Sequence, residues 1–115
     1  NVVFTKDIEG AVLKASIPGK EINKELVTIG AGENWHETVL WSLKNQLYGL
    51  ENLSLIPGTA GAAPVQNIGA YGEEISSKLL SLEAINLLLM NQLLLITNLV
   101  SLSIEKVNLK KITNF

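Results

Sequence analysis

One stretch of this 115-residue chain, from Gly49 to Gly72, combines residue types that suit ligand binding. From Asn52 to Gly72 it carries no charge, and after Pro57 almost every side chain is small. Four of its glycines can adopt positive φ and let another molecule approach the backbone: Gly58, Gly61, Gly69 and Gly72. Their backbone N–H groups could line a concave anion site. Three larger polar side chains suit hydrogen bonding to a planar heterocycle or a sugar: Gln66, Asn67 and Tyr71.

The stretch fits neither common nucleotide-binding loop. No Gly-Lys-Ser/Thr follows it, which excludes a P-loop, and it lacks G-x-G-x-x-G between a strand and a helix. Pro57 and Pro64 are expected to stiffen the path and to prevent helix or central strand. A Gly-rich loop is weak evidence by itself, so a packed Ω-loop without a ligand is the alternative. Ordering so long an aperiodic segment is costly unless something fills it.

The run from Ile56 to Gly72, Ile-Pro-Gly-Thr-Ala-Gly-Ala-Ala-Pro-Val-Gln-Asn-Ile-Gly-Ala-Tyr-Gly, resembles the flavin-binding loop of the UDP-N-acetylenolpyruvoylglucosamine reductase (UDP-N-acetylmuramate dehydrogenase) family. Asn1–Phe4 and Ile29–His36 resemble that family too, and the resemblance covers roughly residues 1–86. It implies an α+β fold, a partial FAD-binding domain of the PCMH-like type. It also implies an oxidoreductase of peptidoglycan precursor synthesis in the cytoplasm. In such an enzyme, NADPH reduces FAD, which passes hydride to the enolpyruvyl double bond of a UDP-sugar to form UDP-N-acetylmuramate.

The resemblance also implies site residues. Backbone contacts with FAD are expected at Gly58, Thr59, Gly61, Ala62 and Ala63. Asn1 would close a loop that holds the cofactor diphosphate, and Gly69 and Ala70 would provide close packing. Gln66 and Asn67 would hydrogen-bond either the flavin or the polypeptide. Tyr71 would face the substrate cavity, with a buried tyrosine as the alternative.

After about residue 100 the sequence departs from the family. We therefore divide the chain into a partial FAD-binding domain (1–100) and a divergent tail (101–115), with the C-terminal substrate domain absent. Glu105 stands where the family has a charge-stabilising Arg, and Ile104 where it has a Tyr. An anion there would oppose negative charge on the substrate. The family's catalytic Ser and Glu belong to the missing domain, so we assign no catalytic residue and expect the isolated chain to be inactive. A non-catalytic flavin-binding module and a decayed pseudo-enzyme are the alternatives.

The elements that would hold this loop follow from periodicity. Strands are expected at Ala11–Ile17 and Leu26–Gly30, and a hairpin at Lys78–Leu87 with Gln92–Thr97. Glu21–Glu25 is interpreted as a connection. A helix is expected at Trp35–Gln46, N-capped by Asn34, with its apolar stripe on a small mixed sheet.

Composition excludes several function classes. A net charge of −2 without a basic run argues against nucleic-acid binding. No cysteine and one histidine argue against a thiolate or multi-His metal site. That histidine, His36, is expected to be a surface or capping residue. The adjacent Glu73 and Glu74 are interpreted as solvated charges rather than a catalytic pair. No leader or 20-residue apolar span is evident, so membrane partners are not expected.

Overall fold

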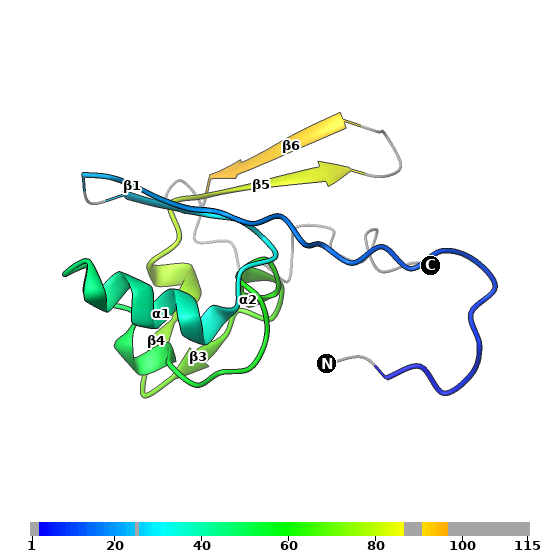
Figure 1. Cartoon of the computed structure of the whole chain (residues 1–115), viewed down its shortest axis with the longest axis horizontal. Helices are drawn as coiled ribbons and strands as arrows, with labels where there is room; N and C mark the ends of the chain where they lie inside the picture. The colour runs from blue at the N-terminus through cyan, green and yellow to red at the C-terminus, as the bar shows by residue number, and fades with distance from the viewer. Residues whose placement is uncertain (1–2, 25, 87–90, 97–115) are drawn as a thin grey trace.

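Short hairpins and short helices are the regular elements of the described residues, as the computed structural model shows (Figure 1). The structure describes residues 3–24, 26–86 and 91–96. The helical elements are α1 (Trp35–Lys44), η1 (Glu51–Leu53), α2 (Ala62–Val65) and η2 (Ile75–Ser77). The strands are β1 (Lys20–Asn23), β2 (Leu26–Ile29), β3 (Gly69–Ala70), β4 (Glu73–Glu74), β5 (Ser81–Asn86) and β6 (Asn91–Ile96).

Helix α1 begins where its sequence predicts. The Asn34 side chain accepts a hydrogen bond of 3.0 Å from the Glu37 N–H, which satisfies a donor that the first turn leaves unpaired. The helix ends at Lys44, two residues before the predicted end. The predicted helix is therefore confirmed.

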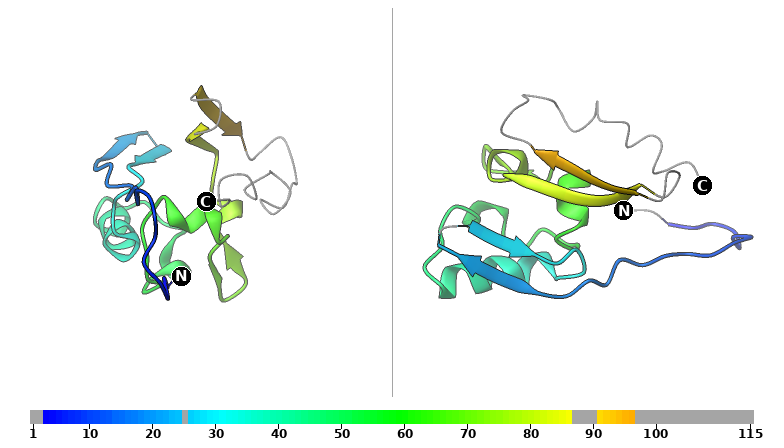
Figure 2. Two further views of the ribbon diagram at one scale, coloured as in Figure 1. Left: turned by 90° about the vertical axis from the view of Figure 1, so that its right-hand side faces the viewer. Right: turned by 90° about the horizontal axis from the view of Figure 1, so that it is seen from above.

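The strands pair in a different way from the expected single mixed sheet. Among the described residues they form three separate two-stranded antiparallel sheets: β1 with β2, β3 with β4, and β5 with β6. The β1–β2 and β5–β6 hairpins lie on the same side of the helical body in Figures 1 and 2. The predicted β5–β6 hairpin is confirmed, with Ser81 opposite Ile96 and Asn86 opposite Asn91.

The predicted strand at Ala11–Ile17 is wrong, and so is the interpretation of Glu21–Glu25 as a connection. Residues 11–19 form no strand, and β1 covers Lys20–Asn23 instead. A strand needs a hydrogen-bonded neighbour, and the sequence alternation at 11–17 does not supply one. Just before β1, the Ile17 and Gly19 carbonyls accept from the Gly32 and Gly30 N–H groups, at 2.8 and 2.7 Å. The chain that precedes this contact extends away from the body (Figure 1).

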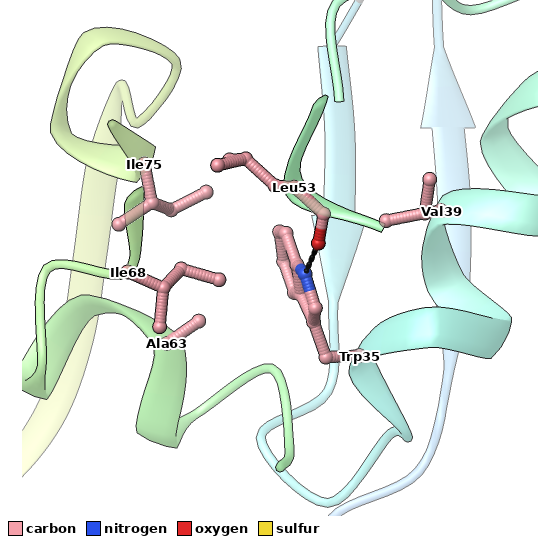
Figure 3. Close-up of a cluster of buried hydrophobic side chains, with 6 residues drawn as sticks. All are labelled: Trp35, Val39, Leu53, Ala63, Ile68 and Ile75. Carbon is pink, nitrogen blue, oxygen red and sulfur yellow. Dashed lines mark hydrogen bonds between the residues drawn. The ribbon is translucent and has the colours of Figure 1, made fainter. Parts of the chain in front are cut away.

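The core is built by α1, by the loop and by η2, which follows the loop. Its buried apolar side chains are Trp35, Val39, Leu53, Ala63, Ile68 and Ile75 (Figure 3). None of these belongs to β1, β2 or β5, so the expectation that the helix stripe would lie on a sheet is wrong. The buried face of α1 also includes Thr38 and Ser42, whose hydroxyls donate to the carbonyls of the N-cap Asn34 and of Val39. The predicted stripe residue Leu40 is exposed.

The loop contains regular structure that its composition argued against. Pro64 lies inside α2, and Pro57 follows η1 by four residues. Proline is tolerated in a first helical turn because the N–H it lacks would have no partner there. The prediction that Pro64 prevents helix is therefore wrong.

Several predictions concern residues outside the described part of the chain. These are the cofactor contact of Asn1, the connection between β5 and β6 at residues 87–90, and Glu105 with the rest of the tail.

Candidate functional site

The start of α1 holds the middle of the loop. The Trp35 N–H donates to the Gly58 carbonyl at 3.0 Å, and the Ala60 N–H donates to the Glu33 carbonyl at 2.8 Å. The Gly61 N–H donates to the Ala31 carbonyl at 3.0 Å. The loop between Gly58 and Gly61 therefore runs antiparallel to the turn that leads into α1.

This pairing leaves two neighbouring backbone N–H groups without an acceptor among the described residues. Asn34 and Thr59 lie opposite each other, but the hydrogen bonds are made by their neighbours. In such a pair the polar backbone groups of Thr59 point away from Asn34. In the part of the chain that the structure describes, neither the Gly58 N–H nor the Thr59 N–H has an acceptor. Two consecutive donors are therefore available to an anionic ligand.

The glycines of the loop differ in what surrounds them. A Cβ added to Gly58 or Gly72 would meet nothing within 4 Å, and both residues have positive φ (132° and 80°). A Cβ on Gly61 would lie 2.7 Å from the Ala31 Cβ, and one on Gly69 would lie 3.1 Å from the Glu73 carbonyl oxygen. The backbone of Gly58 and Gly72 is thus open to another molecule. At Gly61 and Gly69, the missing side chain instead lets other parts of the protein approach closely.

The alanines of α2 are already engaged. The Ala62 and Ala63 N–H groups both donate to the Thr59 carbonyl, at 3.0 and 3.1 Å. Ala63 is buried in the core, and Ala62 is partly exposed. Because both amides are already paired, a ligand could contact only small, apolar surface here.

Asn67 is committed to the protein. Its Nδ2 donates to Glu74 Oε2 at 2.9 Å, and its Oδ1 accepts from the Ser76 N–H at 3.3 Å. Its positive φ of 42° is a conformation that Asn tolerates better than most residues. The neighbouring Gln66 is exposed, and its side chain makes no hydrogen bond to any residue in the described ranges. Of the two amides, only that of Gln66 is available to a ligand.

Tyr71 stands at the tip of the β3–β4 hairpin. Tyr71 and Gly72 connect the strands, and both have positive φ (52° and 80°), as a type I′ turn requires. The Tyr71 side chain is 90% exposed, so the alternative of a buried tyrosine is wrong. Ala70, beside it, packs against the core.

The two adjacent carboxylates have separate partners. Glu73 forms an ion pair of 3.0 Å with Lys78, whereas Glu74 accepts from Asn67. Each helps to hold the hairpin beside η2.

A third carboxylate fastens the N-terminal segment to the turn before α1. Glu33 Oε2 accepts from Lys20 Nζ at 2.5 Å, and Oε1 accepts from the Gly19 N–H at 2.7 Å. The hydrogen bond from Lys20, and then that from Gly19, lower the pKa of Glu33 below its ordinary value. These two hydrogen bonds hold the start of β1 beside the turn before α1, and the loop is hydrogen-bonded to the same turn.

Sequence reasoning missed one contact of the loop. His36 Nδ1 accepts a hydrogen bond of 3.2 Å from the Leu55 N–H. His36 lies off the apolar stripe of α1, and Leu55 is nineteen residues away. No local pattern predicts such a contact. In the described residues there is no cluster of three or more metal-ligating side chains, and no helix there is long and apolar enough to cross a membrane.

Comparison with known proteins identifies the family of the sequence. The sequence model of the FAD binding domain family matches residues 1–87. A UDP-N-acetylenolpyruvoylglucosamine reductase of Polynucleobacter asymbioticus is 57% identical over 89 residues, which cover 73% of this chain and 26% of that protein. Proteins of the same name from Burkholderia lata and Dechloromonas aromatica are 52% identical over 92 residues and 56% identical over 81 residues. These matches cover 76% and 66% of this chain and 26% and 24% of those proteins. The chain thus spans about a quarter of the length of these curated relatives.

Proposed function

The chain belongs to the FAD binding domain family, and we propose from this that it is the flavin-binding part of a UDP-N-acetylenolpyruvoylglucosamine reductase. The observation that carries the proposal is the identity of more than half of the aligned residues to proteins of that name. The NADPH donor, the UDP-sugar substrate and a cytoplasmic location belong to the same proposal.

The loop suits a dinucleotide cofactor. The N–H groups of Gly58 and Thr59, which have no acceptor in the described ranges, are donors for a negatively charged group, and no Cβ blocks the approach to Gly58. Because the loop carries no charged side chain between Asn52 and Gly72, no carboxylate within it opposes an anion. When bound, FAD would supply hydride-transfer chemistry, and the protein supplies its position and surroundings.

Other residues have a supporting part in this proposal. Gln66 offers an exposed amide to the flavin, and Tyr71 an exposed phenol to the substrate. Ala62 contributes a small surface that a flat ring could approach. Gly61, Ala63, Asn67 and Gly69 act indirectly, since their contacts lie within the protein and set the shape of the loop.

Flavin titration of the 115-residue chain tests the proposal. We expect saturable quenching of flavin fluorescence by the wild-type protein. We expect Gly58→Ala to weaken binding by about tenfold or more, since the methyl group occupies the open face and positive φ is unfavourable for alanine. Gly10→Ala is the matched control, because Gly10 also has a positive φ (146°) and open space around its Cβ position but lies outside the loop. Absence of saturable binding, or equal loss in the two variants, would contradict the proposal.

A further inference from the structure

Leu55 adopts a conformation that its own side chain does not explain. Its φ is 61°, in the left-handed region that non-glycine residues seldom occupy. Its side chain is 76% exposed, so burial of leucine does not compensate for the unfavourable backbone. A conformation of this kind persists only where its surroundings hold it.

The contact that holds it is the hydrogen bond from the Leu55 N–H to His36 Nδ1. In the described part of the chain this N–H has no other acceptor. The Nδ1 atom accepts this hydrogen bond only when it carries no proton itself. His36 comes from the first turn of α1, and the next contacts of the loop are made by Trp35 in that turn and by Glu33 just before it.

The contacts form a series along two antiparallel segments. Leu55 is bonded to His36, Gly58 to Trp35, and Ala60 to Glu33. Pro57, with its fixed φ, lies between the first two contacts. Only two residues separate Leu55 from Gly58, and one of them has a fixed φ, so we expect a change in the direction of Leu55 to reach the amides of Gly58 and Thr59.

We propose that His36 is a positioning residue of the flavin site, acting through Leu55 to set the direction of the Gly58 and Thr59 N–H groups. This inference rests on the proposed function, and it assigns to the single histidine a role in binding rather than in catalysis. The property of His36 that matters in this proposal is its hydrogen-bond acceptor at Nδ1. Asparagine at position 36 can place its Oδ1 where Nδ1 lies, whereas alanine offers no acceptor.

The test compares wild-type protein with His36→Asn and His36→Ala in the whole chain. Hydrogen exchange of the Leu55 amide, measured by NMR without flavin, reports the hydrogen bond. We expect exchange to be about tenfold faster in His36→Ala and close to wild type in His36→Asn. For FAD affinity we expect a loss of about fivefold in His36→Ala, the size of one neutral hydrogen bond, and a change within about twofold in His36→Asn.

Repeating the His36→Ala change in Leu55→Gly protein tests whether His36 acts through Leu55. Glycine adopts positive φ without strain, so Leu55→Gly should make the acceptor less necessary. In the Leu55→Gly protein, we expect His36→Ala to reduce FAD affinity by at most half the factor that it does in the wild-type protein.

The outcomes separate the two proposals. If the wild-type chain binds FAD and His36→Ala binds it equally well, the inference fails while the proposed function stands. If His36→Asn loses as much affinity as His36→Ala, the acceptor is not the functional property and the inference fails. If Leu55 exchange follows the expected pattern but even the wild-type chain binds no FAD, the hydrogen bond stands and the proposed function fails, together with the flavin role of His36.

Discussion

Gly61 offers a sharp test of how the loop is held. The sequence predicts that Gly61 lacks a side chain so that the cofactor can approach the backbone. In the structure the missing side chain points toward Ala31: a Cβ would lie 2.7 Å from the Ala31 Cβ and 3.0 Å from its carbonyl oxygen. Carbon atoms in contact prefer about 3.5–4.0 Å. We therefore expect Gly61→Ala to destabilise the protein when no flavin is present.

The magnitude follows from what can move. The Ala31 carbonyl accepts from the Gly61 N–H, so the backbone of residue 31 cannot retreat without lengthening that bond. Overpacking of this kind costs about 1–3 kcal/mol, and replacing glycine by alanine returns about 0.4–1 kcal/mol by restricting the unfolded chain. We expect the free energy of unfolding to fall by about 1–2 kcal/mol. With a urea m-value of about 1–2 kcal/mol/M, the midpoint would fall by about 1 M.

The assay is urea denaturation followed by tryptophan fluorescence, with Ala31→Gly as the compensating change. Removing the Ala31 methyl group relieves the closest contact but leaves the carbonyl, so the double variant should recover about half of the loss. Gly72→Ala is the control, because its Cβ would meet no atom within 4 Å and its cost comes from its φ of 80° alone. Ala31→Gly should not rescue that variant. An unchanged midpoint in Gly61→Ala, or no recovery in the double variant, would refute the packing explanation.

Two further predictions concern the contacts that fasten the loop. Because hydrogen bonds from Lys20 and Gly19 lower the folded-state pKa of Glu33 below 4.5, its contribution to stability should be present above that pH and lost as the pH falls through the folded value. Urea midpoints from neutral pH to roughly pH 3 should therefore decline less in Glu33→Gln than in wild type, and parallel declines would contradict this. Trp35→Phe should lower the free energy of unfolding by about 1–3 kcal/mol, because Trp35 Nε1 donates to the buried Leu53 carbonyl at 2.7 Å and phenylalanine leaves that carbonyl unpaired. Trp41→Phe is the control, since the Trp41 indole makes no hydrogen bond to the described residues, and an equal effect of both changes would count against the role of the bond.

The elements that depend on local chemistry could be predicted. Asn34 caps α1 because its side chain reaches an amide three residues ahead, and both partners are visible in the sequence. The β5–β6 hairpin follows from two apolar runs separated by a short connection. The family was identified for a similar reason, since the run Ile56–Gly72 is long and contiguous.

The long-range arrangement could not be predicted in the same way. Residues 11–17 alternate as a strand would, yet strand formation depends on a partner elsewhere in the chain. The loop was interpreted as a surface for a ligand, but Leu53, Ala63 and Ile68 make it half of the core. Their burial depends on Trp35 and Val39 of α1, and no local pattern joins them.

The sequence by itself determined the cap and the start of the main helix, the β5–β6 hairpin and the FAD binding domain family, because each depends on neighbouring residues. Only the tertiary structure decided which residues of the loop remain available. It engages the amides of Gly61, Ala62 and Ala63 and gives those of Gly58 and Thr59 no acceptor among the residues that the structure describes. It also brings His36 to Leu55. The physical reason is that a hydrogen bond is made by whichever group the fold brings within reach, and residue types alone do not specify that group.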